Sequence, residues 1–474
     1  MEKVGRFFKE SKIFYLIVLF LFFAFIYKFF LSQGTWHFFE YRQGSYYNFL
    51  AKSFLNLKLW VSTEPVADGL YFNGHSFFSW GPPPAVLHAL LIVIKGGEVY
   101  GSTLTYVFSL INLIIFWSII IKLSKIFFKE VRLLILIPIF IAYASGPILF
   151  NVGRGFVYEE SIIIASTFLL SSILFLLFYL ESQDKKNLFL LLSGGSFGLA
   201  ILTRFNLAMY GPLILLYFLL GSLERFPPKN ISLSFVKKFI VFTLPIILAI
   251  SLQFAYNYSR FGNILEFGLK YQQVGESKDK ERQSNNRFMS LQYIPYNAAN
   301  YFFAPIYINK NFQLINHETK NTIGDFPKLT QVVDTGSIFL ASPILLSTLL
   351  SFLYIPFLIR NKKLLIFLAA TQAGLIFFLL FGIFNILSSA LRYAQDFIPI
   401  FYILSFLGLM LLFKRLNFAL AIFISIILFV VSTYSFVLGS YKTCERWIGY
   451  PDWGGKTKNC IKFYKPVDAF TELR

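Results

Sequence analysis

The chain has 474 residues, of which 56% are hydrophobic and only 14% are charged, and its mean hydropathy is +0.63. A soluble protein of this size needs far more polar surface to cover its core, so the composition excludes an ordinary water-soluble enzyme. The formal net charge of +19 does not indicate a nucleic-acid partner, because the basic residues punctuate the apolar runs instead of gathering in one polar segment. The composition predicts one large membrane domain whose main partner is the lipid bilayer.

Apolar runs along the chain predict an all-α polytopic membrane protein with about eleven transmembrane helices. The predicted spans are 13–31, 100–121, 133–150, 160–180, 188–203, 207–220, 238–257, 337–358, 364–384, 393–413 and 416–437. The first run is too long for the core of a usual signal peptide, and no clear cleavage site follows it. We therefore interpret it as an uncleaved anchor.

Residues 84–94 are apolar but too few to cross a bilayer, and three prolines precede or open the run. This pattern favours an interfacial or re-entrant helix. If the segment does not span, the segments on the N-terminal side of the membrane are short and strongly basic, whereas those on the other side are nearly balanced in charge. The positive-inside rule then predicts an integral membrane protein with its N-terminus in the cytoplasm and its C-terminus outside.

Three sizeable outer regions follow from this topology, namely 32–99, 258–336 and 438–474. We expect a membrane domain over 1–437 and an outer tail over 438–474. The tail carries the only two cysteines, Cys444 and Cys460, which form a disulfide or remain free thiols. A zinc site is not indicated there, because no histidine lies near them.

The first outer region carries two acids, Glu40 and Asp68, among interfacial elements. Residues 44–55 have the apolar spacing of an amphipathic helix lying on the membrane, and the Asn73-Gly74 pair is typical of a tight turn. A carboxylate at the membrane surface can act as general base on a sugar or lipid hydroxyl. The alternative, that both are solvated loop acids, stays open.

Short outer turns carry the next group of charged residues. Arg154 and Glu159 lie between the third and fourth spans, Arg204 lies between the fifth and sixth, and Arg392 precedes the tenth. Arg392 and Asp396 stand four residues apart and are expected to share a helix face. Charges at the membrane boundary are costly, and three arginines on one side suit a phosphate group, so we predict a phosphate site. Structural ion pairs or snorkelling arginines are the alternative.

Several other sites are not indicated. The sequence has no P-loop, no Gly-x-Gly-x-x-Gly, no His-Glu-x-x-His and no Gly-x-Ser-x-Gly. The histidines, among them His37, His75 and His88, do not form a metal cluster by spacing. No metal-binding residue is therefore assigned, although a divalent metal as cofactor stays open.

Some motifs resemble those of a known family. They are Tyr46-Tyr-Asn-Phe-Leu-Ala, Gly81-Pro-Pro-Pro-Ala, Gly198-Leu-Ala-Ile-Leu-Thr-Arg204, Arg260-Phe-Gly-Asn-Ile-Leu-Glu-Phe-Gly268 and Arg392-Tyr-Ala-Gln-Asp-Phe-Ile-Pro399. With the first span, they resemble the GT-C class of integral membrane glycosyltransferases, and more narrowly the bacterial relatives of the protein O-mannosyltransferase and lipid A aminoarabinose transferase families. The resemblance covers most of the membrane region, but not the rest of 258–336 or the tail.

The resemblance implies a sugar transfer from a polyprenyl-phosphate donor to a lipid, glycan or protein acceptor on the outer face of a bacterial cell membrane. A carboxylate in the first outer loop would activate the acceptor hydroxyl, the anomeric configuration would invert, and arginines would stabilise the departing phosphate. Glu40 matches the family's acid after the first span, and Arg392 matches its arginine before the late helix. The family usually has Asp where this chain has Glu40, so Asp68 and then Glu159 or Glu160 are the alternative bases.

A multi-pass transporter or flippase for a lipid-linked or anionic solute is the main rival hypothesis. Transporters often show inverted repeats and charges at the membrane midplane. This chain has no visible repeat, and its charges lie at the outer boundaries of the spans. An oligosaccharide polymerase or ligase is a third hypothesis, against which the early loop and its Pro-rich helix argue. The sequence therefore favours the transferase.

Overall fold

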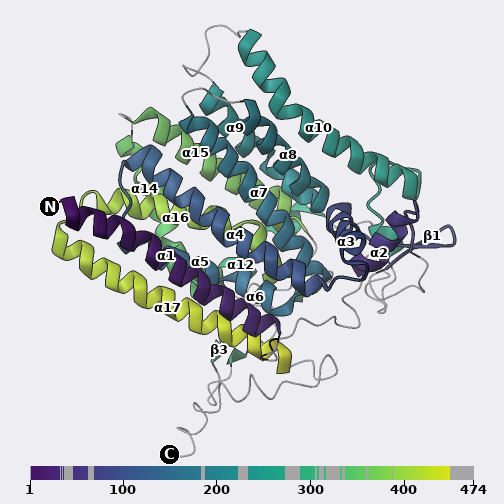
Figure 1. Ribbon diagram of the computed structural model, residues 1–474, viewed down its shortest axis with the longest axis horizontal. Helices are drawn as coiled ribbons and strands as arrows, with labels where there is room; N and C mark the ends of the chain where they lie inside the picture. The colour runs from purple at the N-terminus through teal and green to yellow at the C-terminus, as the bar shows by residue number, and fades with distance from the viewer. Residues whose placement is uncertain are drawn as a thin grey trace, which may run out of the picture.

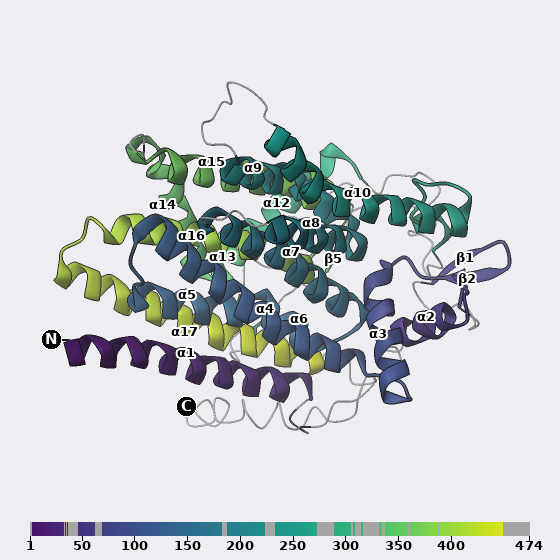
Figure 2. The same cartoon turned by 45° about the horizontal axis from the view of Figure 1, so that its top comes forward.

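The computed structural model describes most of the chain. The described residues are 2–32, 34, 36, 46–61, 69–182, 187–222, 233–272, 289–304, 307–308, 314–315, 331–333, 337–358, 361–386 and 388–448. Glu40, Asp68 and Cys460 lie outside them, as does the side chain of Cys444. Within the described residues the protein is a bundle of helices with three two-stranded sheets (Figures 1 and 2).

Seven helical segments in the described part of the chain are long and apolar enough to cross a membrane. They are α1 (Glu2–Leu31), α4 (Gly101–Leu123) with η1 (Ser124–Phe128), α5 (Leu133–Ser145) with α6 (Pro147–Arg154), α7 (Val157–Glu181), α10 (Leu233–Phe261), α15 (Lys362–Phe378) with η7 (Leu379–Phe384), and α17 (Phe418–Ile448). Each coincides with one of the predicted spans. The predicted class, an all-α polytopic membrane protein, is confirmed.

The other four predicted spans are apolar helices of shorter length. They are α8 (Asn187–Thr203), η2 (Phe205–Tyr210) with α9 (Gly211–Ser222), a broken segment and α16 (Ile398–Phe413). The broken segment consists of α13 (Ile338–Ala341), η5 (Pro343–Ser347), α14 (Thr348–Leu353) and η6 (Ile355–Leu358). Pro343 and Pro356 interrupt it, because proline has no N–H group for the helix ladder. The predicted helix start at 393 was too early, since η8 (Leu391–Asp396) forms a separate turn before α16.

The bundle is held together by aromatic and aliphatic packing. The fully buried rings of Phe116 and Tyr143 stack with centroids 3.7 Å apart where α4 meets α5. At Gly194, α8 approaches α10 so closely that a Cβ atom would lie 2.0 Å from the carbonyl oxygen of Phe242, so only glycine fits. Large apolar side chains on α10 and α17, such as Leu252, remain exposed, as expected of surfaces that face lipid.

One end of the bundle carries most of the remaining elements (Figures 1 and 2). They are α2 (Tyr46–Leu55), β1 (Leu70–Phe72), β2 (His75–Phe77) and α3 (Pro82–Lys95). The predicted helix and turn are confirmed, because Asn73 and Gly74 have φ angles of 49° and 79° between the paired strands β1 and β2. At 14 residues, α3 is too short to span, as predicted.

Short elements complete the described chain. They are η3 (Leu269–Tyr271), η4 (Leu291–Tyr293), α12 (Ile294–Phe302), β3 (Tyr307–Ile308), β4 (Leu314–Ile315), β5 (Gln331–Val333) and β6 (Ser388–Ala390). Strands β3 and β4 pair antiparallel, whereas β5 and β6 pair in parallel.

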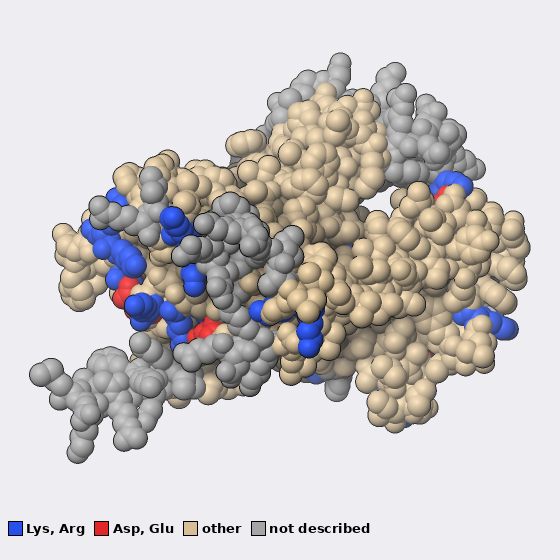
Figure 3. Space-filling model, turned by 90° about the horizontal axis from the view of Figure 1, so that it is seen from above, with Lys and Arg blue, Asp and Glu red and all other residues tan. Residues whose placement is uncertain are grey.

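The opposite end of the bundle is basic. Lys122 at the end of α4 pairs with Glu181 at the end of α7, and Arg132 donates to the carbonyl oxygen of Phe413 at 2.6 Å. On the face seen in Figure 3, Lys and Arg are densest at the left end. Helix α1 begins at this end and α17 finishes at the other, where α2 and α3 lie (Figure 1). On that face, the described basic side chains therefore gather at the end where α1 begins.

Candidate active site

Three turns at the α2–α3 end bring the three predicted arginines into one group. Arg154 ends α6, Arg204 joins α8 to η2, and Arg392 lies in η8. Elements α6 and α7 both contact η8, and η2 contacts η7 next to it. We use the term arginine cluster for Arg154, Glu159, Arg204, Arg392 and Asp396.

The first ion pair of the cluster spans a helix junction. Gly155 adopts a left-handed conformation with φ of 58°, which ends α6 and lets α7 begin two residues later. Glu159 in the first turn of α7 then faces back, and Arg154 Nη1 donates to its Oε1 at 2.9 Å. Glu159 is fully buried, and its Oε2 has no hydrogen-bond partner in the described part of the chain.

The second ion pair joins distant parts of the sequence. Arg204 Nη2 donates to Asp396 Oδ2 at 2.6 Å, and Asn206 Nδ2 donates to the same oxygen at 3.2 Å. The expectation that Arg392 and Asp396 share a helix face was wrong. Residues 391–396 form a 3₁₀ helix, in which side chains three apart are aligned and those four apart are not. Asp396 therefore faces Arg204 and leaves Arg392 free to face elsewhere.

Arg392 lies between the two ion pairs. Its guanidinium carbon is 4.7 Å from the ring centre of Tyr158 and 5.2 Å from that of Tyr393. Burial lowers the pKa of Arg392, but Tyr393 and Glu159 beside it raise the pKa by more, so the group stays charged. Its Nε is buried without a partner among the described residues. With three arginines and two carboxylates, the cluster has a formal charge of +1.

The cluster also changes a neighbouring tyrosine. Burial raises the pKa of the Tyr393 hydroxyl, but the positive charges of Arg392 and Arg204 lower it by more, so its pKa lies below the usual value. The guanidinium carbon of Arg204 is 5.4 Å from the same ring. The field at this ring is thus positive, which favours anions nearby.

A second buried network, which sequence reasoning missed, adjoins the cluster. His88 of α3 bonds through Nδ1 to Asn48 Oδ1 of α2 and through Nε2 to Glu160 Oε1 of α7, both at 2.9 Å. Asn48 Nδ2 donates to the carbonyl oxygen of Val99 at 2.9 Å. We call Asn48, His88 and Glu160 the histidine network. A histidine in an apolar helix was its signal, but the partners are too far away in sequence to be inferred.

Arg260, part of a motif in the sequence, anchors the first outer region. Its Nη1 donates to the carbonyl oxygen of Phe78 at 2.7 Å, and its guanidinium carbon lies 3.8 Å from the ring centre of Tyr256. The residue is 5% exposed, so this contact holds the segment before α3 against α10 from inside. Its contacts indicate a structural role.

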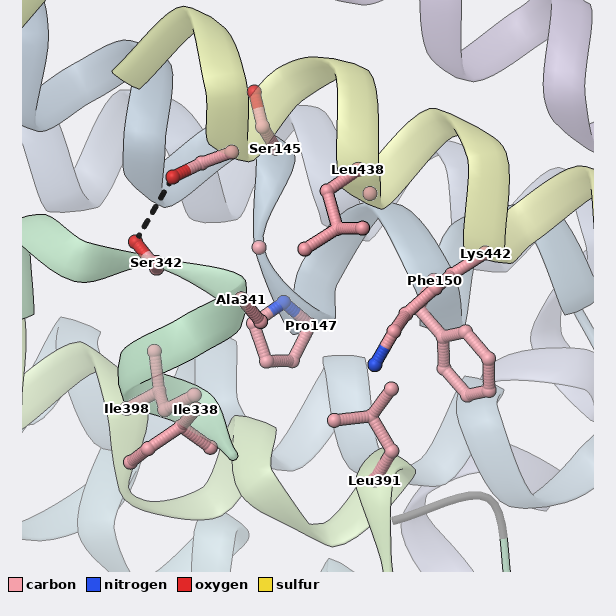
Figure 4. A pocket seen from close by; sticks show the side chains of 13 residues that line it. Ser145, Pro147, Phe150, Ile338, Ala341, Ser342, Leu391, Ile398, Leu438 and Lys442 are labelled. Carbon is pink, nitrogen blue, oxygen red and sulfur yellow. Dashed lines mark hydrogen bonds between the residues drawn. The ribbon is translucent and has the colours of Figure 1, made fainter. Parts of the chain in front are cut away.

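A small, mostly apolar pocket borders the cluster. Phe150 and Leu391 line it, and the next residues, Asn151 and Arg392, are joined by a bond from Asn151 Nδ2 to the Arg392 carbonyl oxygen. Lys442 of α17 points its ammonium group across the pocket toward Leu391 (Figure 4). The pocket thus combines apolar walls with one cation.

The described residues include no group of three or more His, Cys, Asp or Glu side chains that could hold a metal ion. Glu40 and Asp68 lie outside the residues on which this finding rests. A metal requirement therefore stays a question for experiment.

No protein-family model matches the sequence, and no curated protein matches it. Solved structures with a similar overall fold include the archaeal oligosaccharyltransferase AglB from Archaeoglobus fulgidus in complex with an inhibitory peptide and a dolichol-phosphate. The identity is 13%, the TM-score is 0.47, and the match covers 96% of this chain and 60% of that one. Another is ArnT from Cupriavidus metallidurans bound to undecaprenyl phosphate, with 13% identity, a TM-score of 0.45, and coverage of 96% and 75%. This chain spans about three fifths of the length of the oligosaccharyltransferase.

Proposed function

We propose that this protein is a membrane glycosyltransferase that moves a sugar from a polyprenyl-phosphate donor to a hydroxyl group of a lipid, glycan or protein acceptor. The acceptor oxygen attacks the anomeric carbon, the bond from that carbon to the phosphate oxygen breaks, and the configuration inverts. The hydroxyl proton passes to a carboxylate, and polyprenyl phosphate leaves.

The environment of Arg392 is the observation that best supports the proposal. Within the described part of the chain, the other two arginines of the cluster each form an ion pair with a carboxylate. Arg392 forms none there: it lies against two tyrosine rings, bonds to Tyr393, interacts electrostatically with Glu159, and keeps an unbonded Nε. A buried guanidinium without its own carboxylate suits an anionic ligand, and its planar donors match phosphate oxygens.

The charge change during transfer fits the cluster. The donor is a phosphodiester with one negative charge, and the departing polyprenyl phosphate is a monoester that gains a second. A site with a formal charge of +1, fixed in place before the reaction, stabilises the products of bond cleavage more than the donor. The unbonded atoms Arg204 Nε and Arg392 Nε supply donors for the added charge.

The general base belongs to the first outer loop in this proposal. Glu159 already accepts from Arg154, and taking up a proton would cost it that ion pair. Glu40 and Asp68 are therefore the preferred bases, with Glu159 as a partner that holds Arg154 in place. Asp396 holds Arg204 in the same way.

We place the cluster on the outer face of the membrane. The support is the basic end of the bundle opposite to it, with Lys122 and Arg132, which the positive-inside rule assigns to the cytoplasm.

The direct test is transfer by the purified protein from a panel of radiolabelled polyprenyl-phosphate sugars to a membrane lipid extract. We expect transfer from at least one donor, with release of polyprenyl phosphate and inverted configuration in the product. A protein that moves the intact lipid-linked sugar across vesicle membranes without breaking its bond to phosphate would contradict the proposal and favour the flippase.

A further inference from the structure

The histidine network links two parts of the proposed site. Helix α2 follows the segment that carries Glu40, and α3 follows the segment that carries Asp68. Glu160 lies next to Glu159, which belongs to the arginine cluster. His88 is thus the side chain through which α3 is bonded both to α2 and to α7.

The hydrogen bonds of His88 have a defined direction. Asn48 Nδ2 donates to Val99, so Asn48 Oδ1 accepts, and the partner atom His88 Nδ1 must carry a hydrogen. One further proton must lie between His88 Nε2 and Glu160 Oε1, because two lone pairs do not attract each other. The ring is therefore fixed at both nitrogens, and it also stacks on Tyr47 at 6.0 Å between ring centres.

The histidine network is buried more deeply than the arginine side chains of the cluster. Asn48 and His88 are 0% exposed and Glu160 is 1% exposed, whereas the side chains of Arg154 and Arg204 in the adjoining cluster are 14% and 17% exposed. Consecutive residues of a helix point about 100° apart. Glu160 therefore faces α3 while Glu159 faces α6, and fixing Glu160 sets the direction of Glu159.

We infer that His88 is a positioning residue, which holds α2 and α3 at a fixed place relative to the arginine cluster through its bonds to Asn48 and Glu160. This inference rests on the proposed function, because α2 and α3 follow the segments of the sequence that carry Glu40 and Asp68. Loss of the two His88 bonds loosens α2 and α3 against α7, so the base and the anomeric carbon meet less often in reactive geometry.

The test compares three variants in transfer assays at saturating donor. His88→Phe keeps an aromatic ring against Tyr47 but loses both hydrogen bonds. Glu160→Gln keeps a bond, because the amide can donate to His88 Nε2, but removes the carboxylate. His75→Phe is the matched control, since His75 stacks on Trp60 in the exposed β1–β2 hairpin, outside both networks.

We expect His88→Phe to lower kcat on the order of a hundredfold with little change in the KM for the donor. Glu160→Gln and His75→Phe should keep kcat within about threefold of the parent. When the base has already been removed by Glu40→Gln or Asp68→Asn, adding His88→Phe should lower kcat little further, because the base that His88 positions is absent. A folded His88→Phe protein with full kcat would overturn the inference, as would an equal loss in Glu160→Gln.

Hydrogen exchange tests the same inference without any transfer. Amides of residues 46–55 and 82–95 should exchange faster in His88→Phe than in His75→Phe, while those of α5 should not change. If the parent protein transfers no sugar from any donor, the proposed function fails, and this exchange pattern still decides whether His88 holds the loop. Unchanged exchange in His88→Phe would refute the positioning role.

Discussion

Two polar networks meet at the start of α7, and they differ in how completely their atoms are bonded. In the histidine network, both ring nitrogens of His88 and both side-chain atoms of Asn48 have partners. In the arginine cluster, Glu159 Oε2, Arg204 Nε, Arg392 Nε and Asp396 Oδ1 are buried without partners among the described residues. Unbonded buried atoms are costly, so a set of them in one place indicates a ligand site, whereas a completed network indicates a scaffold.

The largest expected loss of transfer comes from a substitution outside both networks. Glu40→Gln should abolish transfer, by on the order of 10²- to 10⁴-fold in rate, because the acceptor hydroxyl loses its proton acceptor. Binding of polyprenyl phosphate should not change, since the arginine cluster is intact. Asp68→Asn is the parallel variant. If Glu40→Gln is fully active and Asp68→Asn is not, the base is Asp68, and if both are active the base lies in the cluster itself.

Arg392→Ala tests the cluster directly. We expect a loss on the order of 10²- to 10³-fold in kcat/KM for the donor, because the leaving phosphate loses the guanidinium that stabilises its added charge. The matched control is Arg415→Ala, since Arg415 also lies against two aromatic rings, those of Tyr354 and Phe357, but beyond the far end of α16. Equal losses in the two variants would remove the distinction between a ligand site and ordinary cation–aromatic packing.

Asp396→Asn should destabilise the protein by about 3 kcal/mol, because Arg204 would keep its charge in a mostly buried place without a carboxylate. Thermal unfolding in detergent measures this. Glu130→Gln is the control, because Glu130 pairs with Arg132 at 2.8 Å with 38% and 30% of the side chains exposed. Surface pairs of this kind contribute about 1 kcal/mol or less. A stable Asp396→Asn protein would show that Arg204 is already satisfied by other groups.

The smallest expected effect is a loss of stability in the histidine network. Asn48→Ala leaves the His88 Nδ1 hydrogen and the Val99 carbonyl without partners and should lower the free energy of unfolding by about 2 kcal/mol. Asn56→Ala removes one exposed bond to the Lys52 carbonyl oxygen and should be nearly neutral. If the unfolding midpoints of the two variants coincide, the histidine network contributes no rigidity and the contrast with the cluster disappears.

Much of the fold could be predicted, because it depends on the length of the apolar runs and on the distribution of charge along the sequence. Apolar runs determine where helices can cross lipid, and the basic segments determine the order of the ends. The segment 337–358 shows the limit. Its apolar content predicts one helix, but Pro343 and Pro356 interrupt the helix, and composition alone does not give the path of a broken helix.

The candidate site, too, could be predicted only in part. The convergence of Arg154, Arg204 and Arg392 follows from topology, because all three lie in turns on one side. Their partners do not follow, since Arg204 bonds to Asp396 across 192 residues of sequence. The link from His88 to Glu160 crosses 72 residues and depends on the packing of α3 against α7.

The short helices α8 and α16 bear on how deep the arginine cluster lies in the membrane. Helix α8 has 17 residues and α16 has 16, so at about 1.5 Å per residue they are about 24 to 26 Å long, less than the roughly 30 Å of the hydrocarbon layer. Arg204 follows α8, and the turn with Arg392 precedes α16. If the other ends of these helices lie level with the inner lipid headgroups, both residues lie several ångströms below the level of the outer headgroups. A phosphate carried on a membrane lipid need only sink slightly to reach them, whereas one dissolved in water would have to leave its solvent.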